Sequence, residues 1–160
     1  MKKILAILTI LCLLCASCAA LADMEIPDFD DMPGVVIEDE NTKVEETSFE
    51  GEWVLQYAFA DREYVYEQTL SEKYDFNFMP YVIGEGKVSQ DLQKENGEFV
   101  TVEMPYTFEA GQLTGEDAAG RTFVVELLED GNIVMSVFFP GEGDTTTCLS
   151  IFLVHPEAKD

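Results

Sequence analysis

Alternating apolar and polar positions dominate the chain from Trp53 onward, and this pattern predicts β-strands. In the first such run, Trp53, Leu55, Tyr57 and Phe59 fall on one face of a strand and Gln56 falls on the other. Four large apolar side chains on one face indicate a strand with one side packed against a core.

Further runs of the same kind cover residues 122–127 and 132–139. The turn sequence between them, residues 129–132, contains Asp-Gly, which is a strong hairpin signal because a tight two-residue turn needs positive φ. A last strand is predicted over residues 146–154, and Pro156 ends it because proline cannot donate to a strand ladder.

The middle of the chain gives weaker signals. A strand through Tyr106 and Phe108 is expected to run into a turn at residues 109–112. Residues 62–74 favour a short helix or an irregular cap, with Asp61 as a candidate N-cap. Less distinct strands are expected at residues 75–80, 82–88 and 98–104.

About eight short strands joined by short connections predict an all-β fold. The arrangement that fits best is an eight-stranded antiparallel up-and-down barrel with one short helix, because closure of the sheet leaves no exposed edges. We place this domain at residues 51–156.

The first 22 residues read as a signal peptide. Lys2 and Lys3 precede an apolar run from Ile4 to Cys15, which is shorter than the roughly 20 residues of a membrane-spanning helix. Small residues follow, and cleavage after Ala22 would fit an A-x-A site. We therefore expect an exported protein, with residues 1–22 removed.

A competing interpretation is lipidation. Cys15-Ala16-Ser17-Cys18 resembles a bacterial lipobox, in which Cys18 would carry the lipid and hold the protein at the outer face of the cytoplasmic membrane. Cleavage after Ala22 is favoured, because the first lipobox position normally holds Leu, Val or Ile and here holds Cys15. Secretion and lipid anchoring both stay open.

Residues 23–50 contain eleven acids and one lysine, with no sustained apolar period. Like charges repel and little apolar surface is available for burial, so the segment predicts a disordered, extended acidic linker.

The whole chain has 32 acidic and 9 basic side chains, for a net charge of −23. This excludes sequence-independent binding of nucleic acid, which requires Lys and Arg to neutralise phosphates. It also argues against docking on anionic lipid through a basic patch, so a lipid anchor is the only membrane attachment we expect.

Candidate catalytic groups are few. His155 is the only histidine, and Cys148 would lie roughly 23 Å away along a straight strand, too far for a nucleophile–base pair. We interpret Cys148 as a small buried apolar residue and His155 as an exposed side chain after the last strand. We expect no catalytic residue, no metal site, no cofactor and no enzymatic activity; a hydrolase is the weakest alternative.

Gly51-Glu52-Trp53 opens the first strand directly after the linker. A G-x-W in this place resembles the lipocalin-like (calycin-type) β-barrel domains, in bacterial form. The resemblance implies that Trp53 plugs one end of the barrel and that an arginine from the last strand stacks on it. The last strand has no arginine, which leaves Arg121 as the substitute; a plain core position for Trp53 is the alternative.

The resemblance also implies a small apolar ligand in the barrel. An aromatic cluster in and after the first strand would lie at the barrel rim, as a ligand site or, as we favour, as a lid over a largely filled barrel. The expected ligand-binding residues are Trp53, Tyr57, Phe59, Tyr64, Tyr66 and Arg121.

The sequence thus predicts an exported, monomeric lipocalin-like binding protein without catalysis. The alternative is a structural or protein-interaction module of the cell envelope that holds no small ligand.

Overall fold

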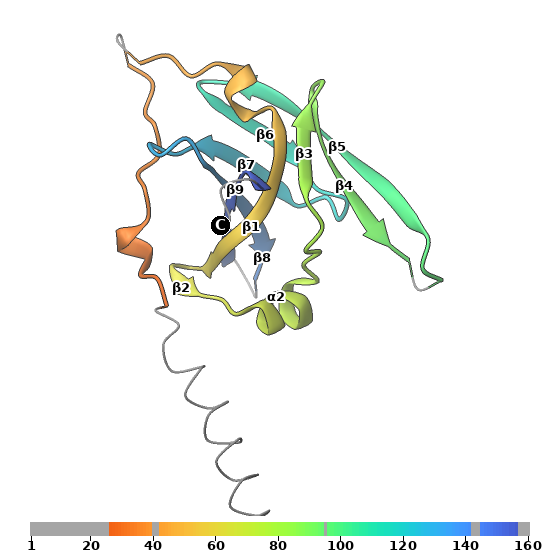
Figure 1. Ribbon diagram of the computed structural model, residues 1–160. Coiled ribbons are helices and arrows are strands. Elements are labelled where there is room, and N and C mark those ends of the chain that lie inside the picture. The colour runs from red at the N-terminus through yellow and green to blue at the C-terminus, as the bar shows by residue number, and fades with distance from the viewer. Residues whose placement is uncertain (1–25, 40–41, 95, 142–144, 157–160) are drawn as a thin grey trace, which may run out of the picture.

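The computed structural model describes residues 26–39, 42–94, 96–141 and 145–156 (Figure 1). The expected signal peptide and the alternative lipidation site at Cys18 lie outside these residues. No helix among the described residues is long and apolar enough to cross a membrane.

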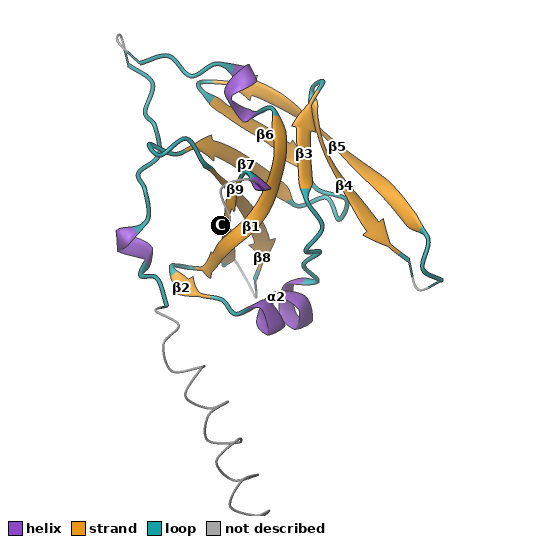
Figure 2. Ribbon diagram, viewed as in Figure 1, coloured by secondary structure: helices purple, strands orange, loops and turns teal. Residues whose placement is uncertain are grey.

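The described chain forms a closed antiparallel β-barrel with one α-helix, as the sequence predicts (Figure 2). Neighbours in sequence pair with each other, and β1 also pairs with β9, which closes the ring. Of the nine strands, the two-residue β2 pairs only with the end of β1 and not with β3, so the other eight form the barrel. The strands are β1 Gly51–Ala60, β2 Glu63–Tyr64, β3 Tyr81–Gly84, β4 Lys87–Gln93, β5 Phe99–Glu109, β6 Gln112–Glu116, β7 Thr122–Leu127, β8 Ile133–Pro140 and β9 Thr146–Val154.

Two long strands change partner along their length and form the corners of the barrel. In β1 the first three residues pair with β3, and the rest pairs with β9. In β5 the stretch Phe99–Pro105 pairs with β4, and the stretch from Tyr106 to Glu109 pairs with β6. At the second corner the backbones of β5 and β6 approach each other closely, since a Cβ on Gly115 would lie 2.5 Å from the carbonyl oxygen of Pro105.

The prediction that Trp53 and Phe59 share one face of the first strand is wrong, because β1 contains a bulge. Leu55 pairs with Leu153 and Tyr57 pairs with Phe152, so Gln56 is an extra residue without a partner on β9. An extra residue moves every later side chain to the opposite face. Trp53 therefore belongs to the inner core while Phe59 belongs to a cluster outside it.

The hairpins are largely as predicted. The β7–β8 turn contains Gly131 at φ +84°, and the β5–β6 turn contains Ala110 and Gly111, both at positive φ. The predicted strand at 82–88 instead contains a hairpin between β3 and β4, with positive φ at Glu85 and Gly86.

The weaker predictions for residues 61–80 are partly wrong. The helix α2 spans Glu67–Tyr74, and Tyr66, without a side-chain cap, occupies its N-cap position. Asp61 instead accepts a hydrogen bond from the N–H of Cys148 at 2.9 Å. The expected strand at 75–80 is irregular chain.

Side chains of the inner core fill one end of the barrel. The helix α2 lies at the other end (Figure 1). Trp53 and Phe49 are fully buried at the first end, and Phe49 contacts Phe108 edge-on. At the second end Leu70 and Tyr74 of α2 are buried, and Tyr74 lies edge-on to Phe139. We call these the closed end and the cavity end.

The prediction of a disordered linker is wrong for the described part of residues 23–50. Residues 26–39, which we call the N-terminal strap, contain the short 3-10 helix Phe29–Asp31 and lie along the outside of the barrel (Figure 1). The N–H of Val36 donates to Leu127 O at 2.8 Å, and the N–H of Glu129 donates to Gly34 O at 2.9 Å. A second 3-10 helix, Glu46–Phe49, leads into β1.

A few apolar side chains are enough to order this segment, because they pack on apolar surface that the barrel already presents. Phe29 and Met32 of the strap cover the outer cluster of Phe59, Leu128, Val134 and Phe152. Further along, Val44 and Phe49 belong to the inner core.

Candidate ligand-binding cavity

A cavity of about 270 Å³ lies inside the barrel at its cavity end. Its walls come from strands β3, β4, β5, β7, β8 and β9, from the turn at residues 117–121, and from the end of α2 with the chain that follows it. The inner wall is mainly apolar, because it is built from the inward positions of these strands. The buried apolar side chains that line it include Met104, Phe123, Met135, Val137, Leu149 and Ile151.

The chain after α2 forms one side of the cavity. Asp75 ends the helix in the left-handed conformation, and Phe76 and Asn77 then line the cavity. Gln90 fixes this segment, since its side-chain amide donates to Asn77 O at 3.1 Å and to Met79 O at 2.7 Å. Gln90 is the one buried side chain with an amide or a charge among the described residues, and these two bonds offset the cost of burying its amide.

The turn at residues 117–121 carries an ion pair that lines the cavity. Arg121 Nε donates to Asp117 Oδ2 at 2.6 Å. Asp117 Oδ1 accepts the backbone N–H groups of Ala119 and Arg121, which fixes the turn that holds both side chains. The guanidinium lies over the ring of Phe139, 4.3 Å from its centre. Among the described residues, none accepts a hydrogen bond from the terminal Nη atoms of Arg121.

Tyr81 adds a buried phenol to the lining of the cavity. The pKa of Tyr81 is raised to about 12, and burial is the largest cause. The hydrogen bond with Gln90 and the charge of Arg121 lower this pKa, and the charge of Asp117 raises it. The phenol therefore stays protonated at neutral pH and is available as a hydrogen-bond donor. The cavity thus combines an apolar interior with polar groups from Tyr81, Gln90 and Arg121.

The closed end explains the G-x-W pattern. Trp53 is fully buried, and its indole N–H donates to Phe49 O at 2.8 Å. Gly51 has φ +135°, and a Cβ there would lie 3.1 Å from the imidazole of His155. His155 stacks on Trp53, with ring centres 3.8 Å apart.

His155 therefore occupies the place for which the sequence suggested Arg121. Its ring Nδ1 also lies 3.1 Å from Glu52 O, and the residue remains exposed as expected. The suggestion for Arg121 is wrong, because Arg121 contacts Phe139 at the cavity end. The sequence signal for His155 was its position one residue after the last strand, which brings it beside the first.

Of the six predicted ligand-binding residues, only Arg121 lines the cavity. Trp53 lies at the closed end, and Tyr57, Phe59 and Tyr64 lie in or against the outer cluster beneath the strap. Tyr66 is exposed and contacts Tyr64 edge-on. The bulge in β1 accounts for the outward positions of Tyr57 and Phe59.

The main cavity residues missed by sequence reasoning are Tyr81, Gln90, Val102 and Met104. The alternation Val88, Gln90, Leu92 is a usable signal, but the pattern over residues 82–88 predicts one strand where the structure has the hairpin between β3 and β4. Tyr81 stands at the first position of β3 and could not be assigned a face without that hairpin.

Other candidate chemistry lies apart from the cavity. Cys148 lies near the start of β9, with Sγ 3.7 Å from Ser150 Oγ, while His155 lies just beyond the other end of that strand. Within the described ranges, no group of three His, Cys, Asp or Glu side chains is placed to hold a metal ion. Comparison with models of known protein families and with curated proteins finds no match to this chain.

Proposed function

We propose that this chain is an exported, lipocalin-like binding protein that carries a small apolar molecule in its barrel and performs no catalysis. The observation that carries the proposal is the cavity of about 270 Å³ with its apolar inner wall. Small-molecule sites usually measure roughly 300–1,000 Å³, so the ligand is smaller than a typical drug. The placement of Gly51 and Trp53 at the opposite, closed end supports the resemblance.

The polar rim gives the bound molecule one preferred orientation. Arg121 is held by Asp117 and by the ring of Phe139, so its guanidinium is positioned before any ligand arrives. A polar atom on the ligand would face Arg121 or Tyr81, while the apolar part would face Met135 and Ile151. Preorganised donors of this kind select for ligands that carry one acceptor group.

The direct test is displacement of an environment-sensitive dye, anilinonaphthalene sulfonate, by a panel of small apolar alcohols, ketones and aromatic compounds. Val102→Phe would place a larger side chain in the cavity wall, and we expect it to weaken binding by about tenfold or more. Val82→Phe makes the same change on the exposed face of β3 and serves as the matched control.

The proposal predicts displacement by at least one class of compound, with loss of affinity in Val102→Phe but not in Val82→Phe. Absence of binding across the panel would contradict it. Equal affinities for both variants would place the dye elsewhere on the molecule and would contradict it as well.

Export is a separate part of the proposal, supported by the basic and apolar pattern of residues 1–22. Mass spectrometry of the mature protein distinguishes the two processing routes. A chain that begins at Asp23 would indicate simple cleavage and secretion. A diacylglycerol-modified Cys18 would indicate an anchored lipoprotein, and an unprocessed chain retained in the cytoplasm would contradict export.

A further inference from the structure

The first half of β5 has an open edge. Residues Phe99–Pro105 pair with β4 on one side, whereas pairing with β6 begins only at Tyr106. Among the described strands, none pairs with the second side of this stretch. Figure 1 shows the β4–β5 hairpin projecting from the rest of the barrel, so this edge lies at the surface.

The register indicates which backbone groups face outward. The N–H of Tyr106 donates to Gly86 O at 3.1 Å and therefore points toward β4. The backbone N–H and C=O groups of successive residues point to opposite sides of an antiparallel strand. The backbone groups of Val102 and Val100 therefore also point toward β4. The N–H and C=O groups of Thr101 and Glu103 consequently face the open edge.

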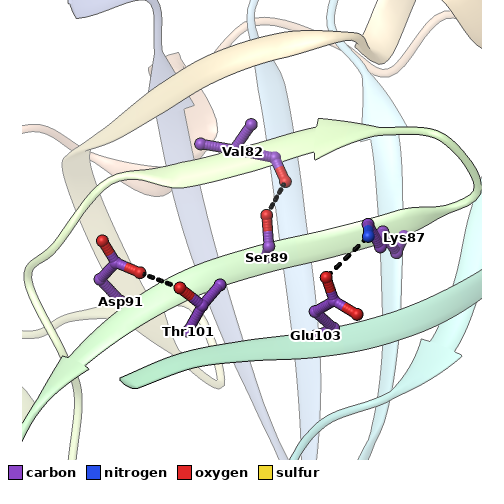
Figure 3. A network of polar contacts seen from close by, with 6 residues as sticks. All are labelled: Val82, Lys87, Ser89, Asp91, Thr101 and Glu103. Atoms are coloured by element: carbon purple, nitrogen blue, oxygen red, sulfur yellow. Dashed lines mark hydrogen bonds and ion pairs between the residues drawn. The ribbon is translucent and has the colours of Figure 1, made fainter. Parts of the chain in front are cut away.

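The side chains of these two residues are turned toward β4 and leave the edge clear. Lys87 Nζ donates to Glu103 Oε1 at 2.6 Å, and Thr101 Oγ1 donates to Asp91 Oδ1 at 2.6 Å (Figure 3). On the edge of β4, by contrast, Asn77 Nδ2 donates to Asp91 O at 2.8 Å and occupies the backbone acceptor there.

Apolar surface accompanies the open edge. Phe99 is 54% exposed and Val100 is 38% exposed. An open strand edge next to exposed apolar side chains favours addition of a further strand, and proteins usually prevent this with a lysine, a bulge or a covering segment. Pro105 limits the edge at one end, but no described bulge or covering segment protects the stretch from Phe99 to Met104.

Charge determines what can add to this edge. A second copy of the chain would bring together two molecules of net charge −23, which repel each other. Near the edge, Glu103 neutralises Lys87, and the acids Asp91 and Glu98 outnumber the remaining cation, Lys94 in the β4–β5 turn. An incoming segment therefore meets a surface on which only a cationic partner gains electrostatic attraction.

We propose that the open edge of β5 binds an extended, lysine- or arginine-bearing segment of another protein by β-strand addition. Hydrogen bonds to the backbone of Thr101 and Glu103 supply the pairing, and apolar side chains of the partner cover Phe99 and Val100. Inward-facing partner side chains lie beside Val102, at the margin of the cavity. This interaction does not depend on a small ligand being bound.

The experiment uses a synthetic probe: a fluorescein-labelled peptide of alternating valine and threonine, flanked by two lysines at each end. A matched peptide carries glutamates at the flanking positions. We expect saturable binding of the lysine peptide by fluorescence anisotropy, weakened by added salt, and at least about tenfold weaker binding of the glutamate peptide.

Amide hydrogen exchange measured by NMR locates the contact and supplies an internal control. The amides of Thr101 and Glu103 should exchange fast in the free protein and become about tenfold or more protected with the lysine peptide. The amides of Val100 and Val102 pair with β4 and should be protected in both states.

Thr101→Pro removes one outward N–H and the hydroxyl bond to Asp91 but no backbone bond to β4, and we expect it to weaken peptide binding by about tenfold. Thr101→Val keeps the N–H and loses only the hydroxyl bond to Asp91, so it should bind as the unchanged protein does. If Thr101→Pro fails to fold, the exchange measurement on the unchanged protein decides the question.

Protection absent at Thr101 and Glu103 would overturn the proposal. Equal binding of the two peptides would overturn the charge selection. Protection that appears with rising protein concentration and no peptide would identify a second copy as the occupant and would also overturn it.

Discussion

At the closed end, the imidazole of His155 stacks on the indole of Trp53 and separates it from solvent. The pairing joins the residue after the last strand to the first strand, so it fixes the point where the barrel closes. The stacking depends on Gly51, whose positive φ and missing Cβ leave room for the imidazole.

His155→Ala should lower the free energy of unfolding by about 1 kcal/mol, because one stacked aromatic pair is lost and Trp53 becomes accessible to water. Urea unfolding followed by circular dichroism measures the change, and iodide quenching of Trp53 emission should increase. His155→Phe retains a stacked ring and should behave as the unchanged protein does. Identical stability of the alanine variant would contradict the stacking role.

Tyr81 predicts a pH effect with a defined sign. Its pKa is raised from 10.0 to about 12 in the folded protein, so the folded state holds the phenolic proton more tightly than the unfolded state. This contribution to stability is complete below pH 10.0 and is lost as pH rises toward about 12, by roughly 2–3 kcal/mol.

Urea midpoints measured across this alkaline range test that effect. The unchanged protein should lose stability more steeply with rising pH than Tyr81→Phe, which has no phenol to ionise at this position. Parallel curves for the two proteins would contradict the assignment, because the remaining tyrosines are present in both.

At the scale of elements, the β7–β8 hairpin was predictable, because its Asp-Gly turn and the strict alternation in residues 122–139 depend only on local geometry. The bulge at Gln56 was not predictable, since one extra residue leaves the composition of the strand unchanged and is visible only in its register with β9. That bulge turns Phe59 away from the interior, and only Arg121 of the expected site residues lines the cavity.

The strap shows a different limit of sequence reasoning. Its acids indicated disorder, yet Phe29 docks edge-on against Phe59 and Phe152, with ring centres 5.2 Å and 6.2 Å apart. Arg62 also contacts this ring and forms an ion pair with Asp30. Order here depends on an outer apolar cluster that no pattern within the strap reveals.

Phe29→Ala should therefore destabilise the protein by about 1–3 kcal/mol, because the outer cluster loses its cover. Ile37→Ala, in the same strap but 82% exposed, is the matched control and should change stability little. Thermal unfolding measures the stability of each variant, and hydrogen exchange of the amide of Val36 reports whether the strap stays bound to the barrel. Equal melting temperatures for both variants would show that the strap contributes no stability.

For the whole molecule, a net charge of −23 makes self-repulsion a general term in stability. Exposed acids interact through water, where added salt screens them over about 10 Å at 0.1 M ionic strength. The three described salt bridges involve at least partly exposed side chains, so their screening costs little.

The melting temperature should consequently rise when sodium chloride is added at neutral pH, as relief of repulsion outweighs the weakening of surface ion pairs. Scanning calorimetry at increasing salt concentration measures it, with sucrose at equal osmolarity as the uncharged control. A melting temperature that is unchanged or lower in salt would contradict the dominance of repulsion.

The corner strand β5 has one more consequence. Val102 and Met104 line the cavity from the same stretch of strand whose backbone is open at the surface. A molecule held inside the barrel and a strand added outside it would therefore share one structural element. If occupancy of one changes the affinity of the other, thermodynamic linkage requires the reverse effect to have the same factor, and a bound molecule would then alter the binding of a partner.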